Sequence, residues 1–135
     1  MTEFDYREEF SDGKPVFRPV ADVIIHANEL KVEVAMYIDS GADITLIPFR
    51  FGKALGFRQH EAETIKHMHG ITGSIPYLSR KAKLQLGNEI FEAEIARSLI
   101  EEVPPLLGRQ DVFDRYEVVF KQRNKKIFFK EEISM

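Results

Sequence analysis

Apolar and polar residues alternate along several stretches of this chain, and this alternation limits the possible folds more than any other feature of the sequence. Four apolar residues recur at every second position between Lys31 and Asp39: Val32, Val34, Met36 and Ile38. A period of two is typical of a β-strand with one buried face, because successive side chains of a strand point to opposite sides. The same pattern returns in residues 81–86 and 91–95. The sequence therefore predicts a mostly β protein.

Three pairs of stretches predict β-hairpins. Val20–Ile25 precedes the first alternating stretch across Ala27-Asn28-Glu29. Residues 81–86 and 91–95 flank Gly87-Asn88, a two-residue turn that tolerates positive φ. Residues 117–121 and 126–129 flank the polar turn 122–125. Helix is expected only in two short segments, one between Pro48 and Gly56 and one from Arg109 to Tyr116.

Composition excludes several classes of protein. The 135 residues suit one domain, and the formal charge of 19 − 22 = −3 argues against a general nucleic-acid binder. The absence of cysteine excludes disulfides, a thiolate nucleophile and a Cys-ligated zinc site. No apolar run approaches the roughly 20 residues of a membrane helix, and the acidic, polar start is unlike a secretory signal. We expect a soluble, cytoplasmic protein with no membrane or nucleic-acid partner.

The segment Asp39-Ser40-Gly41-Ala42-Asp43 follows the strand pattern 31–38 and precedes the apolar run Ile44-Thr45-Leu46-Ile47. Asp, Ser and Gly all favour turns, so an ordinary surface turn is one interpretation. The apolar flanks instead place Asp39 where two buried strands converge. A charge is costly in such a position, and charged groups there tend to be functional. Asp39 is therefore the first candidate for a catalytic group.

Three segments, taken together, resemble the retropepsin-like aspartic proteases. Asp39-Ser40-Gly41-Ala42-Asp43 is similar to the catalytic loop of that family. His69-Gly70-Ile71-Thr72-Gly73 resembles the glycine-containing flap that closes over substrate, and Leu106-Leu107-Gly108-Arg109 resembles the apolar-apolar-Gly motif beside the catalytic loop. The resemblance implies a retropepsin-like closed β-barrel, the acid-protease fold, with one or two short helices and one lobe per chain.

The resemblance also implies roles for the loop residues. Asp39 would be the catalytic carboxylate. Ser40 would form a hydroxyl-to-backbone bond across the dimer axis, and Gly41 would let substrate and backbone approach closely. Asp43, beside Ala42, would bind the substrate main chain.

Arg109 would pair with Asp43 within one subunit and so position it. Gly70, Ile71 and Gly73 would contact substrate from the flap. An ordinary surface arginine and a local capping carboxylate are the alternative interpretations of Arg109 and Asp43.

Aspartic proteolysis needs two carboxylates about 3 Å apart that share one proton. The chain has one Asp-Ser/Thr-Gly sequence, and 135 residues are short for a two-lobed protease. A complete site would then require two chains that meet on a two-fold axis, each contributing Asp39. We expect a homodimeric aspartic endopeptidase that cleaves an extended peptide or protein substrate and needs no cofactor.

Two other functions stay open at this point. One is a catalytically silent retropepsin-fold module for dimerisation or peptide binding. The other is a monomer whose aspartates meet only under particular conditions, such as acid pH. A metal pair at His67 and His69 lacks a third ligand at motif spacing, so we expect no metal site.

Residues 1–19 precede the first stretch predicted to be a core strand, Val20–Ile25. We expect residues 1–19 to form an N-terminal extension that adds a hairpin to the body, shapes the dimer interface or covers the cleft, and residues 20–135 to form the protease domain. Ile127–Phe129 would join a dimer sheet or belong to the core.

Overall fold

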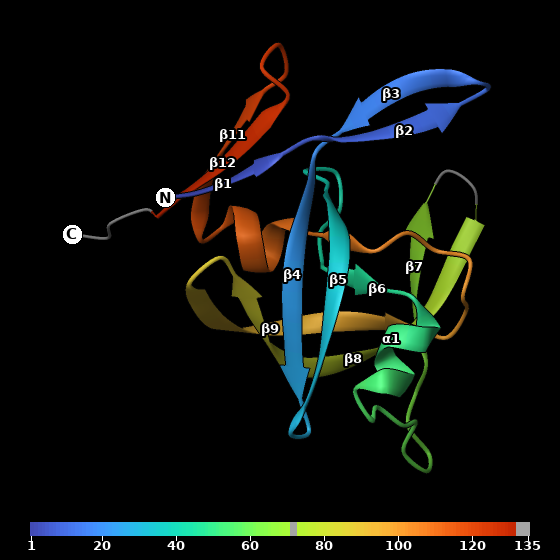
Figure 1. Ribbon diagram of the computed structural model, residues 1–135. Coiled ribbons are helices and arrows are strands. Elements are labelled where there is room, and N and C mark those ends of the chain that lie inside the picture. The colour runs from blue at the N-terminus through green and yellow to red at the C-terminus, as the bar shows by residue number, and fades with distance from the viewer. Residues whose placement is uncertain (71–72, 132–135) are drawn as a thin grey trace.

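The computed structural model describes residues 1–70 and 73–131. It is 59% strand with two short helices, which confirms the predicted mostly β class (Figure 1). In chain order the elements are β1 (Thr2–Asp5), β2 (Arg7–Ser11), β3 (Lys14–Arg18), β4 (Val20–Ala27), β5 (Leu30–Ile38), β6 (Leu46–Ile47), α1 (Phe49–Ala54), β7 (Lys66–Gly70), β8 (Gly73–Leu86), β9 (Glu89–Ser98), β10 (Leu106–Leu107), η1 (Arg109–Phe113), β11 (Tyr116–Lys121) and β12 (Lys126–Glu131).

The main sheet has seven strands in the order β4-β5-β10-β6-β9-β8-β7, and β4 also pairs with β8. Most neighbours are antiparallel, but β10 runs parallel to β5, and β6 runs parallel to β9. The short strand β10 therefore lies between β5 and β6, two strands that are consecutive in the chain.

The three expected hairpins are confirmed. β4 pairs with β5 across Asn28 and Glu29, which have φ of 52° and 62°. Positive φ at both central residues is the conformation of a type I′ turn, whose twist matches that of the two strands it joins. Leu86 pairs with Glu89 across the Gly87 turn, and β11 pairs with β12.

Both helical segments also lie where the sequence predicts them. α1 begins directly after Pro48 and is followed by Gly56, whose φ of 77° ends it. η1 is a single π-helical turn that follows β10. It carries Arg109 at its first position, next to the strand that separates β5 from β6.

The main core lies between the strands of the large sheet and the sheet β1-β12-β11. Ile127 and Phe129 are 0% and 1% exposed, and β12 is flanked by β1 on one edge and β11 on the other. Ile127 and Phe129 are therefore core residues of their own chain. Within the described residues, no helix has the length and apolar character needed to cross a membrane.

Residues 1–18 form three strands. β1 pairs with β12, and β2 and β3 form a separate two-stranded hairpin that turns at Asp12 and Gly13. Figure 1 shows this hairpin projecting away from the main sheet, on the side where β5 ends.

Candidate active site

The segment Asp39–Asp43 leaves the end of β5, where β10 lies next to it. Ile38 is paired in parallel with Leu107, and Leu106 is paired with Leu46 of β6. Ile38 and Leu107 are buried, so the chain enters the loop from a fixed point in the core. Asp39 itself is half-buried, and Ser40 and Gly41 are exposed.

Backbone hydrogen bonds hold this loop against the segment that follows β10. The N–H of Asp39 donates to the carbonyl of Leu107 at 3.3 Å. The N–H groups of Arg109 and Gln110 donate to the carbonyls of Ala42 and Asp43 at 2.9 and 3.0 Å. The loop is therefore fixed at its start and along its second half by residues distant in the sequence.

Gly108 is the point of closest approach between the two segments. A Cβ at this position would lie 2.3 Å from the carbonyl carbon of Ile44. The N–H of Gly108 donates to the hydroxyl of Thr45, which is 0% exposed, at 3.1 Å. Thr45 was not among the residues predicted for the site, since its only local signal is a single hydroxyl inside an apolar run.

The carboxylate of Asp39 turns back over its own loop. Its Oδ1 accepts a hydrogen bond from the N–H of Gly41 at 2.9 Å, and a Cβ on Gly41 would lie 3.1 Å from the same oxygen. The glycine therefore gives the carboxylate both a donor and the space it occupies.

Arg109 forms an ion pair with Asp43 through its Nη2 and the carboxylate Oδ1. Both side chains are largely solvent-exposed, at 54% and 70%. The pair joins the end of the Asp39–Asp43 loop to the first residue of η1. It is the pairing expected from the sequence.

Residues of the β2–β3 hairpin help to line a pocket beside Asp39. Glu9, Arg18, Tyr37 and Leu106 are among the residues that line it with Asp39. The hydroxyl of Tyr37 donates to the carboxylate of Glu9 at 2.6 Å. This hydrogen bond, then burial and the charge of Glu9, raise the pKa of Tyr37.

Glu9 and Tyr37 were not among the residues predicted for the site. The alternation of β5 contains a signal for Tyr37, because residues two apart on a strand share a face, and Tyr37 precedes Asp39 by two. No local signal connects Glu9 with either residue.

A small apolar cluster lies beside the loop. Its buried members are Leu46, Ala96 and Val103. Half-buried side chains pack against them from the loop, from β10 and from the β7–β8 hairpin: Ile44, Met68, Ile75, Tyr77 and Leu106. Leu106 borders both this cluster and the pocket at Asp39. An apolar surface therefore continues from Asp39 to the β7–β8 hairpin.

At the end of that hairpin Gly70 pairs with Gly73, and Ile71 lies outside the described residues. His67 and His69 are exposed on one face of β7. In residues 1–70 and 73–131 no three His, Asp or Glu side chains are grouped as metal ligands.

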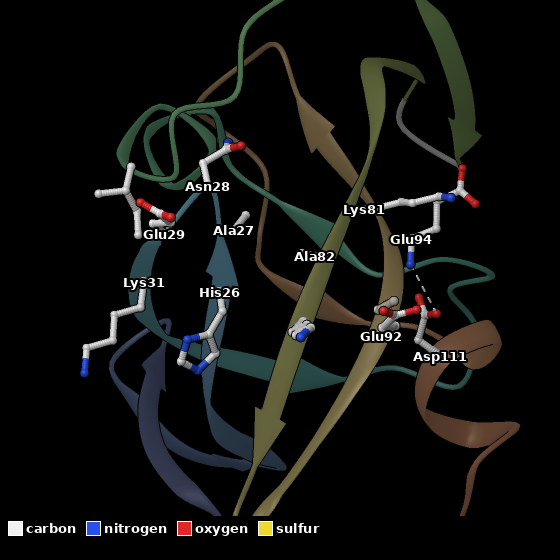
Figure 2. Close-up of a pocket in the computed structure, with 13 residues that line it drawn as sticks. His26, Ala27, Asn28, Glu29, Lys31, Lys81, Ala82, Glu92, Glu94 and Asp111 are labelled. Atoms are coloured by element: carbon white, nitrogen blue, oxygen red, sulfur yellow. Dashed lines mark hydrogen bonds between the residues drawn. The ribbon is translucent and has the colours of Figure 1, made fainter.

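A larger hollow lies elsewhere on the surface (Figure 2). It extends from the end of the β4–β5 hairpin, with His26 of β4 and Asn28 of the turn, across β8 and β9 to Asp111. Burial raises the pKa of the Asp111 carboxyl, which accepts a hydrogen bond from the N–H of Glu94 at 3.4 Å. None of the residues predicted for the site lines this hollow, so its size does not make it the candidate active site.

Solved structures with the same fold were found by comparison. One is the EIAV protease in complex with an inhibitor, which is 19% identical, with the match covering 78% of this chain and 92% of that chain at a TM-score of 0.57. Another is a retropepsin-like aspartic protease from Rickettsia conorii, which is 15% identical, with 94% and 98% covered at a TM-score of 0.64. No protein-family model and no curated protein matches the sequence. The chain therefore has the fold of retropepsin-like aspartic proteases.

Proposed function

We propose that this chain is an aspartic endopeptidase that is active as a homodimer. The observation that carries the proposal is the position of Asp39. The carboxylate of this half-buried residue accepts a hydrogen bond from the N–H of Gly41. The loop that contains it is held by backbone hydrogen bonds to the residues after β10. The two solved structures described above that share this fold are the EIAV protease and a retropepsin-like aspartic protease.

The dimer follows from the number of aspartates the reaction needs. Two carboxylates about 3 Å apart share one proton, because like charges that close cannot both ionise. The chain has one Asp-Ser/Thr-Gly sequence, so the second carboxylate comes from Asp39 of another copy. Ser40 and Gly41, both exposed, lie where the two loops would meet.

The proposed chemistry uses no group other than the two aspartates and water. The ionised Asp39 accepts a proton from the water as the water oxygen attacks the peptide carbonyl carbon. The protonated Asp39 transfers its proton to the carbonyl oxygen, so that a tetrahedral diol forms. The proton taken from water then passes to the leaving amine nitrogen as the C–N bond breaks. One hydroxyl of the diol gives its proton to the other carboxylate as the new carboxyl group forms, so the dyad again holds one proton.

The substrate is an extended peptide that lies between the loop and the β7–β8 hairpin. Its side chains contact the apolar surface of Ile44, Met68 and Leu106, and its main chain bonds to the groups around Asp43. Arg109 positions Asp43. This arrangement favours cleavage between apolar residues.

The β7–β8 hairpin acts as the flap in this proposal. Glycines at its end allow the backbone to change conformation as it closes over the peptide. Gly70 and Gly73 contact the substrate there, together with Ile71.

The test is a digest of a mixed peptide pool, analysed by mass spectrometry from acid to neutral pH, with Asp39→Asn and Asp43→Asn in parallel. Cleavage by the wild type and none by Asp39→Asn is the expected result. Cleavage that persists in Asp39→Asn would overturn the assignment. No cleavage by a dimeric wild type that still binds the peptides would favour the catalytically silent binding module.

A further inference from the structure

The β2–β3 hairpin, which we call the arm (residues 7–18), has one apolar face that is open to solvent. Directly paired residues share a side of the hairpin, so Glu8 and Phe17 lie on the same face as Phe10 and Pro15. This outer face consists of these four residues. Phe10 is 72% exposed and Phe17 is 39% exposed, with the ammonium of Lys125 lying 5.3 Å from the Phe17 ring centroid.

The opposite, inner face fastens the arm to the body beside Asp39. Glu9 accepts the hydroxyl of Tyr37 at 2.6 Å, and Arg18 Nε lies 3.6 Å from Glu9 Oε1. Glu9 and Arg18 line the same pocket as Asp39. The arm therefore leaves the body next to the candidate catalytic loop. Its outer face meets the body at Phe17, which lies beneath Lys125, and is most open to solvent at Phe10.

An isolated two-stranded hairpin is marginally stable in water, because it has no second layer on which to bury side chains. The arm places Phe10, Pro15 and Phe17 on the face that lacks that layer. Exposed apolar patches next to polar residues mark surfaces that contact another molecule. Figure 1 shows the arm projecting beyond the main sheet, where such a molecule has access to it.

We infer that the outer face of the arm packs against a second copy of this chain. The inference rests on the proposed function, because two Asp39 side chains about 3 Å apart bring the second copy against the loop beside which the arm is fastened. Each arm strand has five residues and so spans about 17 Å, which is enough to reach across the partner's surface.

The outer face carries one charge, Glu8, because Arg7, Glu9 and Arg18 lie on the inner face, where Arg7 pairs with Asp22 and Arg18 with Glu9. A mostly apolar face is best covered by another apolar surface, and two-fold symmetry would cover the arms of both copies at once.

The first test measures the dimer dissociation constant of Phe10→Glu by sedimentation equilibrium. Leu30→Glu is the matched control, since Leu30 is also an exposed apolar residue, at 47%, and begins β5 at the end of the molecule opposite the arm (Figure 1). We expect the dissociation constant to rise at least tenfold for Phe10→Glu and to stay unchanged for Leu30→Glu. Circular dichroism checks that both variants remain folded.

The second test uses the absence of cysteine in the chain. Ser11→Cys at the arm's turn and Lys31→Cys at the opposite end are each labelled with a thiol-reactive photo-crosslinker and mixed with a tagged, cysteine-free copy. We expect an adduct between the two chains for Ser11→Cys and none for Lys31→Cys.

The outcomes separate this inference from the function on which it rests. A wild-type dimer whose affinity Phe10→Glu leaves unchanged, with no adduct at Ser11→Cys, would overturn the arm contact and leave the homodimeric protease standing. A wild type that is monomeric at every concentration would overturn the homodimer, and the arm contact with it. If Phe10→Glu keeps its dimer affinity but raises KM for peptides, the occupant is substrate, and the inference is wrong.

Discussion

The buried hydroxyl of Thr45 accepts a hydrogen bond from the backbone N–H of Gly108 at 3.1 Å, across 63 residues of sequence. This contact joins the segment after the Asp39–Asp43 loop to the segment after β10. The N–H of Gly108 is buried with it, so the bond cannot be replaced by one to bulk water.

Thr45→Val should lower the free energy of unfolding by about 1–3 kcal/mol, because it leaves the buried Gly108 N–H without an acceptor while keeping the shape of the side chain. Urea denaturation measures this change. Thr64→Val is the matched control, since Thr64 is exposed, and its stability should be nearly unchanged. Equal losses in the two variants would contradict a special role for the Thr45 bond.

Gly108→Ala and Gly41→Ala should separate stability from activity. A Cβ on Gly108 meets the backbone of Ile44 at 2.3 Å, so the protein should lose about 1–3 kcal/mol or more, as overpacking does. A Cβ on exposed Gly41 meets only the Asp39 carboxylate, at 3.1 Å, so stability should change little while kcat falls about tenfold or more. Peptide assays and denaturation on both variants check this, and full activity in Gly41→Ala would count against the proposed site.

Breaking the Asp43–Arg109 pair should affect substrate binding more than folding. Because both side chains are more than half exposed, Arg109→Met should cost less than about 1 kcal/mol of stability. KM for peptides should rise severalfold in Asp43→Asn and in Arg109→Met, and the double variant should be no worse than the worse single variant. Arg50→Met, in the exposed pair with Glu101, is the control and should leave KM unchanged.

Stability in acid should depend on Glu63. Hydrogen bonds from Arg80 and from the N–H of His60 lower the pKa of Glu63 from 4.5 to about 2. Since the folded-state pKa lies below the unfolded value, the pair stabilises the fold above pH 4.5, and this contribution is lost as the pH falls toward 2. Urea denaturation at a series of pH values from about 5 to about 2 covers both pKa values. The free energy of unfolding should fall more steeply with decreasing pH in the wild type than in Glu63→Gln.

Glu61→Gln is the control for that pH series, because Glu61 is an exposed neighbour. It should lose stability with the wild-type slope. Identical slopes for the wild type and Glu63→Gln would show that the Glu63–Arg80 pair contributes nothing in this range.

The sequence predicted the hairpins well because alternation and turn chemistry are local. Positive φ at Asn28 and at Gly87 occurs where short turns were expected between alternating stretches. The arm is different, since Phe10 and Phe17 are exposed and its strands show no buried face.

The sequence predicted one contact of the candidate site. Asp39, Asp43 and Arg109 were named as candidates from their motifs, and the structure brings the last two together. The contacts of Tyr37 with Glu9 and of Thr45 with Gly108 connect residues 28 and 63 positions apart, and no periodic pattern records such pairs. The sequence also left open whether Phe129 belongs to the core or to a dimer sheet. The answer depends on β1, which pairs with the edge of β12 that β11 leaves free.

The pairing of strand β8 predicts which of its ends unfolds locally more often. Gly73–Pro76 pair only with β7 within the main sheet, whereas Tyr77–Leu86 pair with β9, and Leu84 is also paired with β4. One continuous strand thus belongs first to a two-stranded ribbon and then to the part of the sheet that has neighbours on both edges. Amide hydrogen exchange along β8 should therefore rise from some of the slowest rates in the chain near Leu84 to some of the fastest near Ser74, with the change falling at Tyr77.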